Sequence, residues 1–298
     1  MDRALRRLDE PADPPRRGRR RLWPSPGVLV VLALIVVAGL LITYSGMSFS
    51  HLPNVSGSGV SNASNTGRTT VISNAPTTNH LASQARLLPA PAGVPVSHAY
   101  KTLHRDLFNP VTWEPCRAIH YVVRRGEEPR RFDDMLEQAI AAVSRATGLK
   151  FVNDGTTAEL MLRNPDERLA YQPRLYGDRW APVLISWSDP SESPELAGTI
   201  EGFGGPVSWA PPGGPLRYVS GTVAYNVPHM TQTYREPHGA VLVRDILLHE
   251  LGHLVGLAHI SDRGQIMYPE VIRPLPGYAA GDLAGLAKLG DGNCYPDY

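Results

Sequence analysis

Residues 249–259 read HELGHLVGLAH, and this stretch decides what fold and chemistry the rest of the chain has to support. His249 and His253 lie four residues apart, so on a helix their side chains project from one face and can reach one ion. Gly256 can adopt the left-handed backbone conformation that ends a helix and turns the chain. We expect that turn to bring His259 back to the same ion.

Three protein ligands plus a water are the usual surroundings of a catalytic zinc, and imidazole nitrogen is a normal zinc ligand. Glu250 follows the first histidine, close enough on the helix to reach a zinc-bound water. Zinc lowers the pKa of that water and polarises a carbonyl, and Glu250 would act as the general base. The stretch therefore predicts one catalytic zinc ion. The main alternative is a structural zinc, which would call for a fourth protein ligand and no glutamate.

The full spacing resembles that of the metzincin clan of zinc peptidases, most closely its matrixin-like group. Residues 266–269, IMYP, are similar to the methionine turn of that clan. The resemblance implies that Met267 forms an apolar floor beneath the zinc-binding rings and is not a ligand. It extends over about residues 100–298, although its specific motifs lie only within 249–269.

The resemblance also implies how a substrate would bind. Residues 221–226 would be the edge strand that pairs, through its backbone, with an extended peptide or protein substrate. Residues 270–278 would wall the pocket for the residue that follows the cleaved bond, and residues 282–288 would be the closing helix. The implied activity is that of a zinc-dependent endopeptidase, in which a zinc-activated water hydrolyses the peptide bond.

Four features depart from the matrixin pattern. Ile260 comes between the third histidine and Ser261. Pro269 stands where some relatives carry a tyrosine ligand. Neither cysteine lies in a pro-segment from which it could keep the enzyme latent. Finally, residues 202–214 contain no acidic residue, so bound calcium is not supported.

The remainder of the C-terminal half alternates β-rich and helical segments. Strands are expected at residues 119–123, 151–152, 159–162, 183–187 and 218–226, with a Gly/Pro-rich loop at 202–214. Helices are expected from Phe132, which opens a row of apolar residues at helical spacing, and over 239–255, with a short one over 281–289. The predicted fold is an α+β domain, mainly one twisted sheet with two long helices, of roughly 200 residues.

The N-terminal part indicates membrane attachment. Residues 1–22 hold eight arginines and four acidic residues, and residues 27–46 contain no charge over 20 positions. A helix of that length covers about 30 Å, the thickness of a bilayer core, and the preceding arginines favour a cytoplasmic N-terminus. We expect a single-pass signal anchor with the C-terminal domain outside the cell membrane. A cleaved signal peptide, which would give a secreted protein, is the alternative.

Composition divides the chain into four parts. Ser, Asn, Thr, Gly and Pro dominate residues 47–97, and such a stretch cannot bury enough apolar surface to order itself. The expected parts are a basic cytoplasmic arm at 1–26, the membrane anchor at 27–46, a flexible stalk at 47–97 and the peptidase domain at 98–298.

The chain has two cysteines, Cys116 and Cys294, one near each end of the expected domain. An external location permits a disulfide between them. Two free buried thiols are the alternative.

The overall charge of +1 gives no indication of nucleic-acid binding, and the sequence does not reveal the oligomeric state. Two other functions remain open: a catalytically silent binding module that kept the fold, and a zinc amidase that acts on cell-wall peptides. Glu250 argues against the silent module, because loss of the base is the simplest route to such silence.

Overall fold

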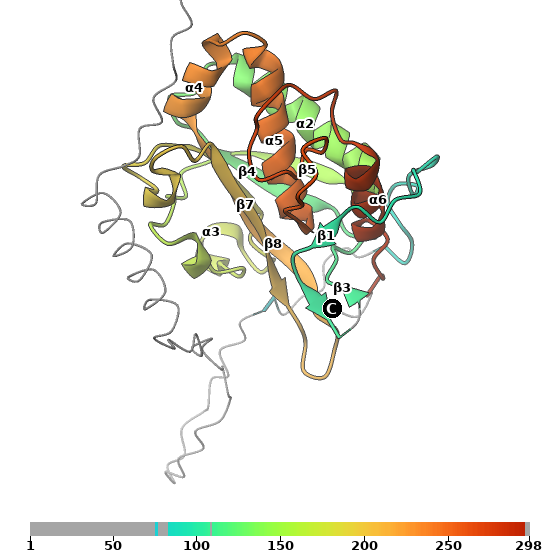
Figure 1. Cartoon of the computed structure of the whole chain (residues 1–298). Coiled ribbons are helices and arrows are strands. Elements are labelled where there is room, and N and C mark those ends of the chain that lie inside the picture. Colours follow the sequence, from blue (N-terminus) through green and yellow to red (C-terminus); the bar gives the residue numbers. More distant parts are fainter. Residues whose placement is uncertain (1–74, 77–82, 108, 296–298) are drawn as a thin grey trace, which may run out of the picture. The chain divides into compact units, whose positions relative to one another are not determined.

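The computed structural model describes residues 75–76, 83–107 and 109–295. At its centre lies a five-stranded sheet in the order β5-β4-β6-β8-β7 (Figure 1). The strands are β4 (Ile119–Arg124), β5 (Phe151–Thr157), β6 (Val183–Ser188), β7 (Gly202–Trp209) and β8 (Arg217–Asn226). Within this sheet β7 is antiparallel to β8, and the other neighbouring pairs are parallel. All six residues of β6 are buried, as expected for a central strand covered on both faces.

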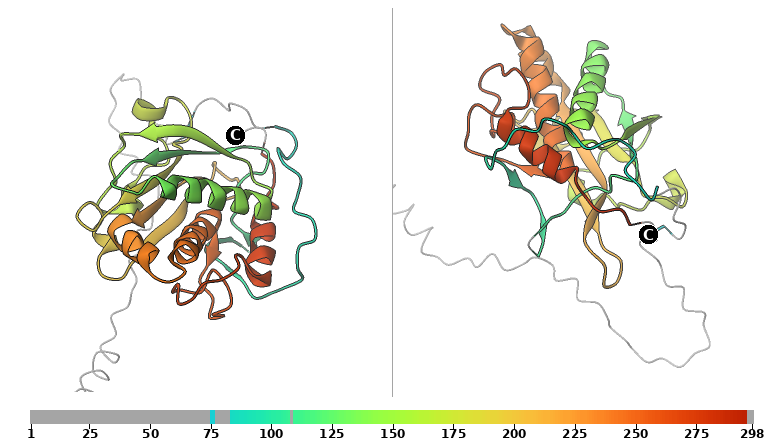
Figure 2. Two further views of the ribbon diagram at one scale, coloured as in Figure 1. Left: turned by 90° about the horizontal axis from the view of Figure 1, so that it is seen from above. Right: turned by 90° about the vertical axis from the view of Figure 1, so that its right-hand side faces the viewer.

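Helices form a layer on one face of the sheet (Figure 2). They are α2 (Arg131–Thr147), α4 (Val227–Arg235), α5 (Gly239–Val255) and α6 (Ala280–Leu289). The main core lies between this layer and the sheet, where buried side chains such as Phe132, Ile185 and Leu247 meet. Burial of this apolar surface is what holds the two layers together.

The opposite face of the sheet carries a smaller core, in which Leu184 packs with Met161 and Leu196. It is covered by the chain between β5 and β7. That chain includes the short helix α3 (Pro173–Tyr176) and 3-10 turns at Pro165–Glu167 and Pro194–Leu196. Two small two-stranded sheets complete the fold: β1 (Lys101–Thr102) with β9 (Leu257–Ala258), and β2 (Arg105–Asp106) with β3 (Asn109–Pro110).

The mixed α/β architecture with two long helices is confirmed. The periodicity that begins at Phe132 belongs to α2, which ends at Gly148 in the left-handed conformation. Helix α5 has the predicted bounds, and α6 starts one residue before its predicted first residue. Helix α4 was not predicted. Its start could have been found, because the side chain of Asn226 caps it by accepting a hydrogen bond from the N–H of His229.

The predicted strand at 159–162 is wrong, because β5 ends at Thr157 and the following residues are irregular. The carboxylate of Glu159 is bound by Arg168 at 2.8 and 2.9 Å and by the hydroxyl of Tyr176 at 2.5 Å. These contacts fold the chain around one buried charge. Leu160 lies inside the predicted strand, but its side chain is 71% exposed and does not pack in a core.

The predicted edge strand at 221–226 is also wrong. These residues belong to β8, which lies between β6 and β7. The edge strand is β7, inside the segment expected to be a Gly/Pro-rich loop. Pro206 is tolerated there because an edge strand leaves one row of backbone groups outside the ladder.

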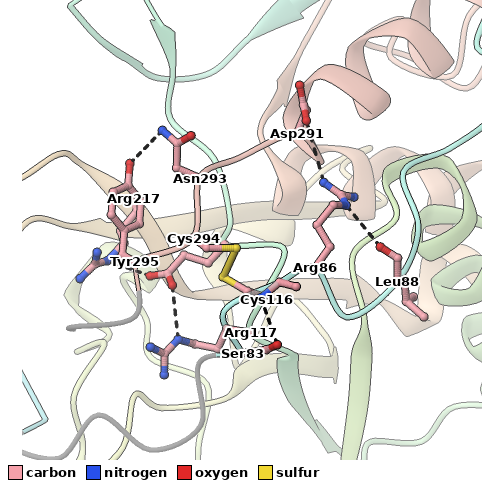
Figure 3. Close-up of a disulfide and its surroundings, with 12 residues drawn as sticks. Ser83, Arg86, Leu88, Cys116, Arg117, Arg217, Asp291, Asn293, Cys294 and Tyr295 are labelled. Atoms are coloured by element: carbon pink, nitrogen blue, oxygen red, sulfur yellow. Dashed lines mark hydrogen bonds and ion pairs between the residues drawn. A yellow bond between two sulfur atoms is a disulfide. The ribbon is translucent and has the colours of Figure 1, made fainter.

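A disulfide joins Cys116 to Cys294, which lie 178 positions apart in the sequence (Figure 3). Close to it, Arg86 donates hydrogen bonds to the backbone oxygens of Gly290, Thr147 and Gly148. One guanidinium therefore serves the C-terminal ends of both α2 and α6, where backbone oxygens lack helical partners. Part of the expected stalk, around Arg86, is thus hydrogen-bonded to the domain.

None of the helices in the described part of the chain is long and apolar enough to span a bilayer. The expected anchor at 27–46, the basic arm at 1–26 and most of the expected stalk lie outside the described residues.

Candidate metal centre

The three histidines of the 249–259 stretch converge on one point. The Nε2 atom of His249 lies 3.1 Å from those of His253 and His259, and these last two are 3.0 Å apart. Three nitrogens at about 2.0–2.1 Å from one tetrahedral zinc would be about 3.3 Å apart. The observed triangle is close to that size, so the three atoms fit a single ion.

Backbone carbonyls fix the orientation of two of these rings. The Nδ1 atom of His249 lies 2.7 Å from the carbonyl oxygen of Ile266, and that of His253 lies 2.7 Å from the carbonyl oxygen of Leu257. A carbonyl can only accept, so both Nδ1 atoms carry the proton and both Nε2 atoms present lone pairs. Lone pairs that face one another cannot hydrogen-bond, whereas a cation between them satisfies all of them. This donor set fits zinc.

Burial keeps the same rings neutral. It lowers the pKa of His249 to about 3, helped by His253 and His259, and it lowers the pKa of His253 to about 4. The pKa of His259 is also lowered by burial. Neutral imidazole is the form that binds metal. His259 is the exposed member of the three, so the site opens to solvent on its side.

The third histidine reaches the cluster through the predicted turn. Gly256 has a φ of +112° and ends α5 in the left-handed region. A Cβ atom at this position would lie 3.0 Å from the Tyr218 ring and 3.1 Å from Leu289, so a larger residue would be strained and crowded. The residue is needed both for its backbone conformation and for its small size.

Met267 lies against α5, the helix that carries His249 and His253. It is 1% exposed, and a Cβ atom at Gly252 would come within 2.5 Å of its sulfur. Gly252 is the residue just before His253, and it lets the methionine approach the helix backbone between the two ligands. The importance of Gly252 was not recognised from the sequence.

Asp282 holds the methionine turn in place through hydrogen bonds to its backbone. Its Oδ2 accepts the N–H groups of Ile266 and Ala279 at 2.9 Å each, and its Oδ1 accepts that of Met267 at 3.3 Å. The side chain is 1% exposed, and burial raises the pKa of its carboxyl group. Since Ile266 also holds His249 through its carbonyl, Asp282 supports a ligand through one intervening residue. This role of Asp282 was not predicted from the sequence.

Glu250 is buried beneath the first residue of β7. It is 6% exposed, and a Cβ atom at Gly202 would lie 2.9 Å from its Cγ atom. Burial raises the pKa of Glu250 to about 8, and the negative charge of Glu201 adds to the shift. A carboxyl group with a raised pKa holds a proton readily, which suits a group that takes and returns protons.

Tyr225, by contrast, does not line the site. It is fully buried and its hydroxyl donates to the carbonyl oxygen of Leu247 within the core.

Helix α5 also holds the segment after the methionine turn. Asp245 accepts the N–H of Leu275 at 2.8 Å, and Arg244 donates to the carbonyl oxygen of the same residue. The hydroxyl of Tyr278 donates to the carbonyl oxygen of Leu248 at 2.6 Å. These contacts tie the C-terminal part of segment 270–278 to α5.

Residues 191–285 match the Matrixin family model, a peptidase family. This part of the chain is matrixin-like. The resemblance that the motifs indicated is thereby confirmed, and zinc is the metal expected in matrixins. The matrixin-like segment contains β7, β8, α5 and all three histidines, and ends within α6.

Among the solved structures that are similar to the chain are two that each cover 58% of it. An archaemetzincin from Methanopyrus kandleri is 16% identical over 95% of its own length, with a TM-score of 0.37. High choriolytic enzyme 1, a hatching enzyme zinc-protease from the medaka fish Oryzias latipes, is 14% identical over 89% of its length, with a TM-score of 0.29. A search of curated protein sequences gives no match.

Proposed function

We propose that the chain is a zinc-dependent endopeptidase. The observation that carries the proposal is the triangle of Nε2 atoms from His249, His253 and His259, with Glu250 directly after the first ligand. The match to the Matrixin model supports the peptidase class. Bound zinc would supply the positive charge that polarises a scissile carbonyl and makes a water molecule acidic.

Glu250 has the position and the environment of the general base. It would take a proton at a carboxylate oxygen and later give that proton to the leaving amine. Its burial beneath β7 limits access of bulk water to the carboxyl group. We assign Met267 and Gly256 supporting roles, since one packs under the ligands and the other forms the turn to His259.

An extended substrate would pair with β7. This strand ends the sheet on one side, and its residues Gly202 and Gly204 lie over Glu250. Backbone hydrogen bonds along an exposed edge bind a peptide without regard to its sequence, and side-chain pockets then add selectivity. Segment 270–278 is the proposed wall of one such pocket. This arrangement supports cleavage inside a chain over removal of terminal residues.

The decisive experiment compares zinc-loaded wild-type protein with Glu250→Gln on a mixed peptide library that includes cell-wall peptides. Mass spectrometry should show internal cleavage by the wild type, loss of cleavage on chelation, and loss in the variant with its zinc content unchanged. Glu236→Gln, at an exposed position after α4, is the matched control and should retain full activity.

Turnover by Glu250→Gln at the wild-type rate would contradict the role of this residue. Cleavage confined to cell-wall peptides would indicate the amidase. If the zinc-loaded wild type cleaves no peptide at all, the silent binding module becomes the better description.

We further propose that the domain acts outside the cell membrane, anchored by residues 27–46. The disulfide between Cys116 and Cys294 supports an oxidising environment. Added protease should remove the C-terminal domain from intact cells, and alkaline carbonate should leave the anchor in the membrane fraction. Release of the whole chain by carbonate would contradict the anchor.

A further inference from the structure

A cavity of about 370 Å³ lies at the N-terminal ends of the parallel strands. Its lining includes Ile119 at the start of β4, Val152 near the start of β5, and Pro182 just before β6. None of the three metal-binding histidines lines it. A volume of this size falls within the range of small-molecule sites, about 300–1,000 Å³, and is far larger than a packing defect.

The cavity and Glu250 lie at opposite ends of β8. Tyr218, the second residue of the strand, lines the cavity. Tyr225, the last residue but one, pairs with Gly202, which covers Glu250. The cavity is therefore a different feature from the proposed substrate cleft.

Two indole rings form walls that are held in place. The Nε1 atom of Trp113 donates a buried 3.0 Å hydrogen bond to the carbonyl oxygen of Leu254. Trp180 packs on Trp209 with ring centroids 5.1 Å apart, and it forms an isolated bridge with Tyr171. A cavity with fixed walls cannot collapse to exclude water, so an apolar ligand that fills it gains the full benefit of burial.

The disulfide region supplies a third wall. Arg117 follows Cys116, and the N–H of Ser83 donates to the carbonyl oxygen of Cys116 at 2.9 Å (Figure 3). The N–H of Leu87 donates to the carbonyl oxygen of Pro115 at 2.9 Å, which ties segment 83–87 to the rim. Leu87 and Arg117 thus contribute an apolar and a cationic group to the lining.

Positive charge predominates around the cavity. The lining contains three cationic side chains and one carboxylate: Arg117, Lys150, Arg179 and Glu114. Two ion-pair partners lie just outside the lining, since Arg217 pairs with Glu114 at 3.1 Å and Asp154 with Arg179 at 2.8 Å. Counting them gives four cations and two carboxylates.

Lys150 is exposed and forms no ion pair with any described residue. Its charge is therefore available to a negatively charged ligand.

We propose that this cavity is a second binding site, for a small molecule with an apolar body and one carboxylate group. The indole and aliphatic walls would hold the apolar body, and the exposed Lys150 would attract the carboxylate, whereas Arg117 already pairs with Glu114 at 3.7 Å. The site does not depend on the proposed peptidase activity, because its lining contains neither Glu250 nor any of the three histidines.

Three matched probes test the proposal: naphthoate, naphthamide and naphthylmethylammonium, which share one ring system and differ in charge. Isothermal titration of the purified protein should show the tightest binding for naphthoate, with the amide weaker and the cation weakest. Lys150→Glu should weaken naphthoate binding by about fivefold or more and leave the amide nearly unchanged. Lys101→Glu, at an exposed lysine of β1 outside the lining, is the matched control and should behave as wild type.

A second variant locates the site without changing any charge. Ala118→Phe would fill part of the cavity and should abolish binding of all the probes that bind the wild type, while circular dichroism and zinc content stay unchanged. Naphthoate binding should persist in Glu250→Gln and after chelation of zinc, so failure of the peptidase proposal would leave this result intact. Equal affinity for the three probes, or naphthoate binding that is lost with zinc and unaffected by Lys150→Glu, would overturn the proposal.

Discussion

The backbone N–H of Ile266 donates a 2.9 Å hydrogen bond to Oδ2 of Asp282. Because the carbonyl of Ile266 accepts the Nδ1 proton of His249, one residue joins the buried carboxylate to a metal ligand. Asp282→Asn would present an amide N–H to a cluster of N–H donors, which is repulsive. We expect zinc affinity to fall by about 10–100-fold, the usual cost of losing support behind a ligand. Competition with a chromophoric chelator measures this, and Asp291→Asn, at an exposed position, should have no effect.

A buried ion pair predicts how stability depends on pH. Burial alone would raise the pKa of Glu159, but hydrogen bonds and charge from Arg168, together with Tyr176 and Gln172, lower it overall. The pair therefore stabilises the fold above the unfolded pKa of about 4.3, and this contribution is lost as pH falls through the lower folded pKa.

Glu159→Gln should reduce the free energy of unfolding by about 3 kcal/mol at neutral pH, because it leaves the Arg168 charge buried without its partner. The difference in free energy of unfolding between wild type and variant should narrow below about pH 4, because protonation of Glu159 then removes the same negative charge from the wild type. Urea titrations at several pH values test this. Glu167→Gln, at an exposed position, should have the stability of the wild type at every pH. A stability difference between Glu159→Gln and wild type that grows in acid would contradict the predicted pH dependence.

The hydrogen bond from the N–H of Leu275 to Asp245 predicts that loss of this carboxylate changes substrate selectivity. Removal of the carboxylate in Asp245→Ala leaves the N–H of Leu275 without its acceptor and so loosens segment 270–278 from α5. For an endopeptidase, we expect a rise in KM and a broader choice of residue after the cleaved bond, with zinc content unchanged. Profiling of cleavage sites measures this, and an unaltered profile with a uniformly lower kcat would refute the positioning role.

Metal removal should destabilise the domain. Only the folded chain brings the three histidines together, so zinc at about a thousandfold excess over its dissociation constant would stabilise it by about 4 kcal/mol. Thermal unfolding should therefore shift to lower temperature on chelation. His253→Ala should unfold at the temperature of the chelated wild type and be insensitive to chelator, whereas sensitivity equal to that of the wild type would place the ion elsewhere.

Much of the fold could be read from local patterns. Helices α2 and α5 carry continuous apolar rows with glycine directly after them, and β6, VLISWS, is mostly apolar and contains no Gly or Pro. Strand β7 was missed because five of its eight residues, GFGGPVSW, have low or uncertain strand preference. Gly202 and Gly204 are explained by the closeness of α5, which no local pattern reveals.

The sequence by itself indicated the three histidines that can hold one metal ion, because spacing along one helix and a glycine turn are local properties that short-range geometry fixes. The sequence alone also indicated the likeness to matrixins, through the motifs within residues 249–269. The tertiary structure alone decided which strand forms the edge of the sheet, how Asp282 supports His249 through Ile266, and where the second cavity lies. Each of these depends on contacts between residues far apart in the chain, and such contacts are set by how the layers pack and not by the residues on either side.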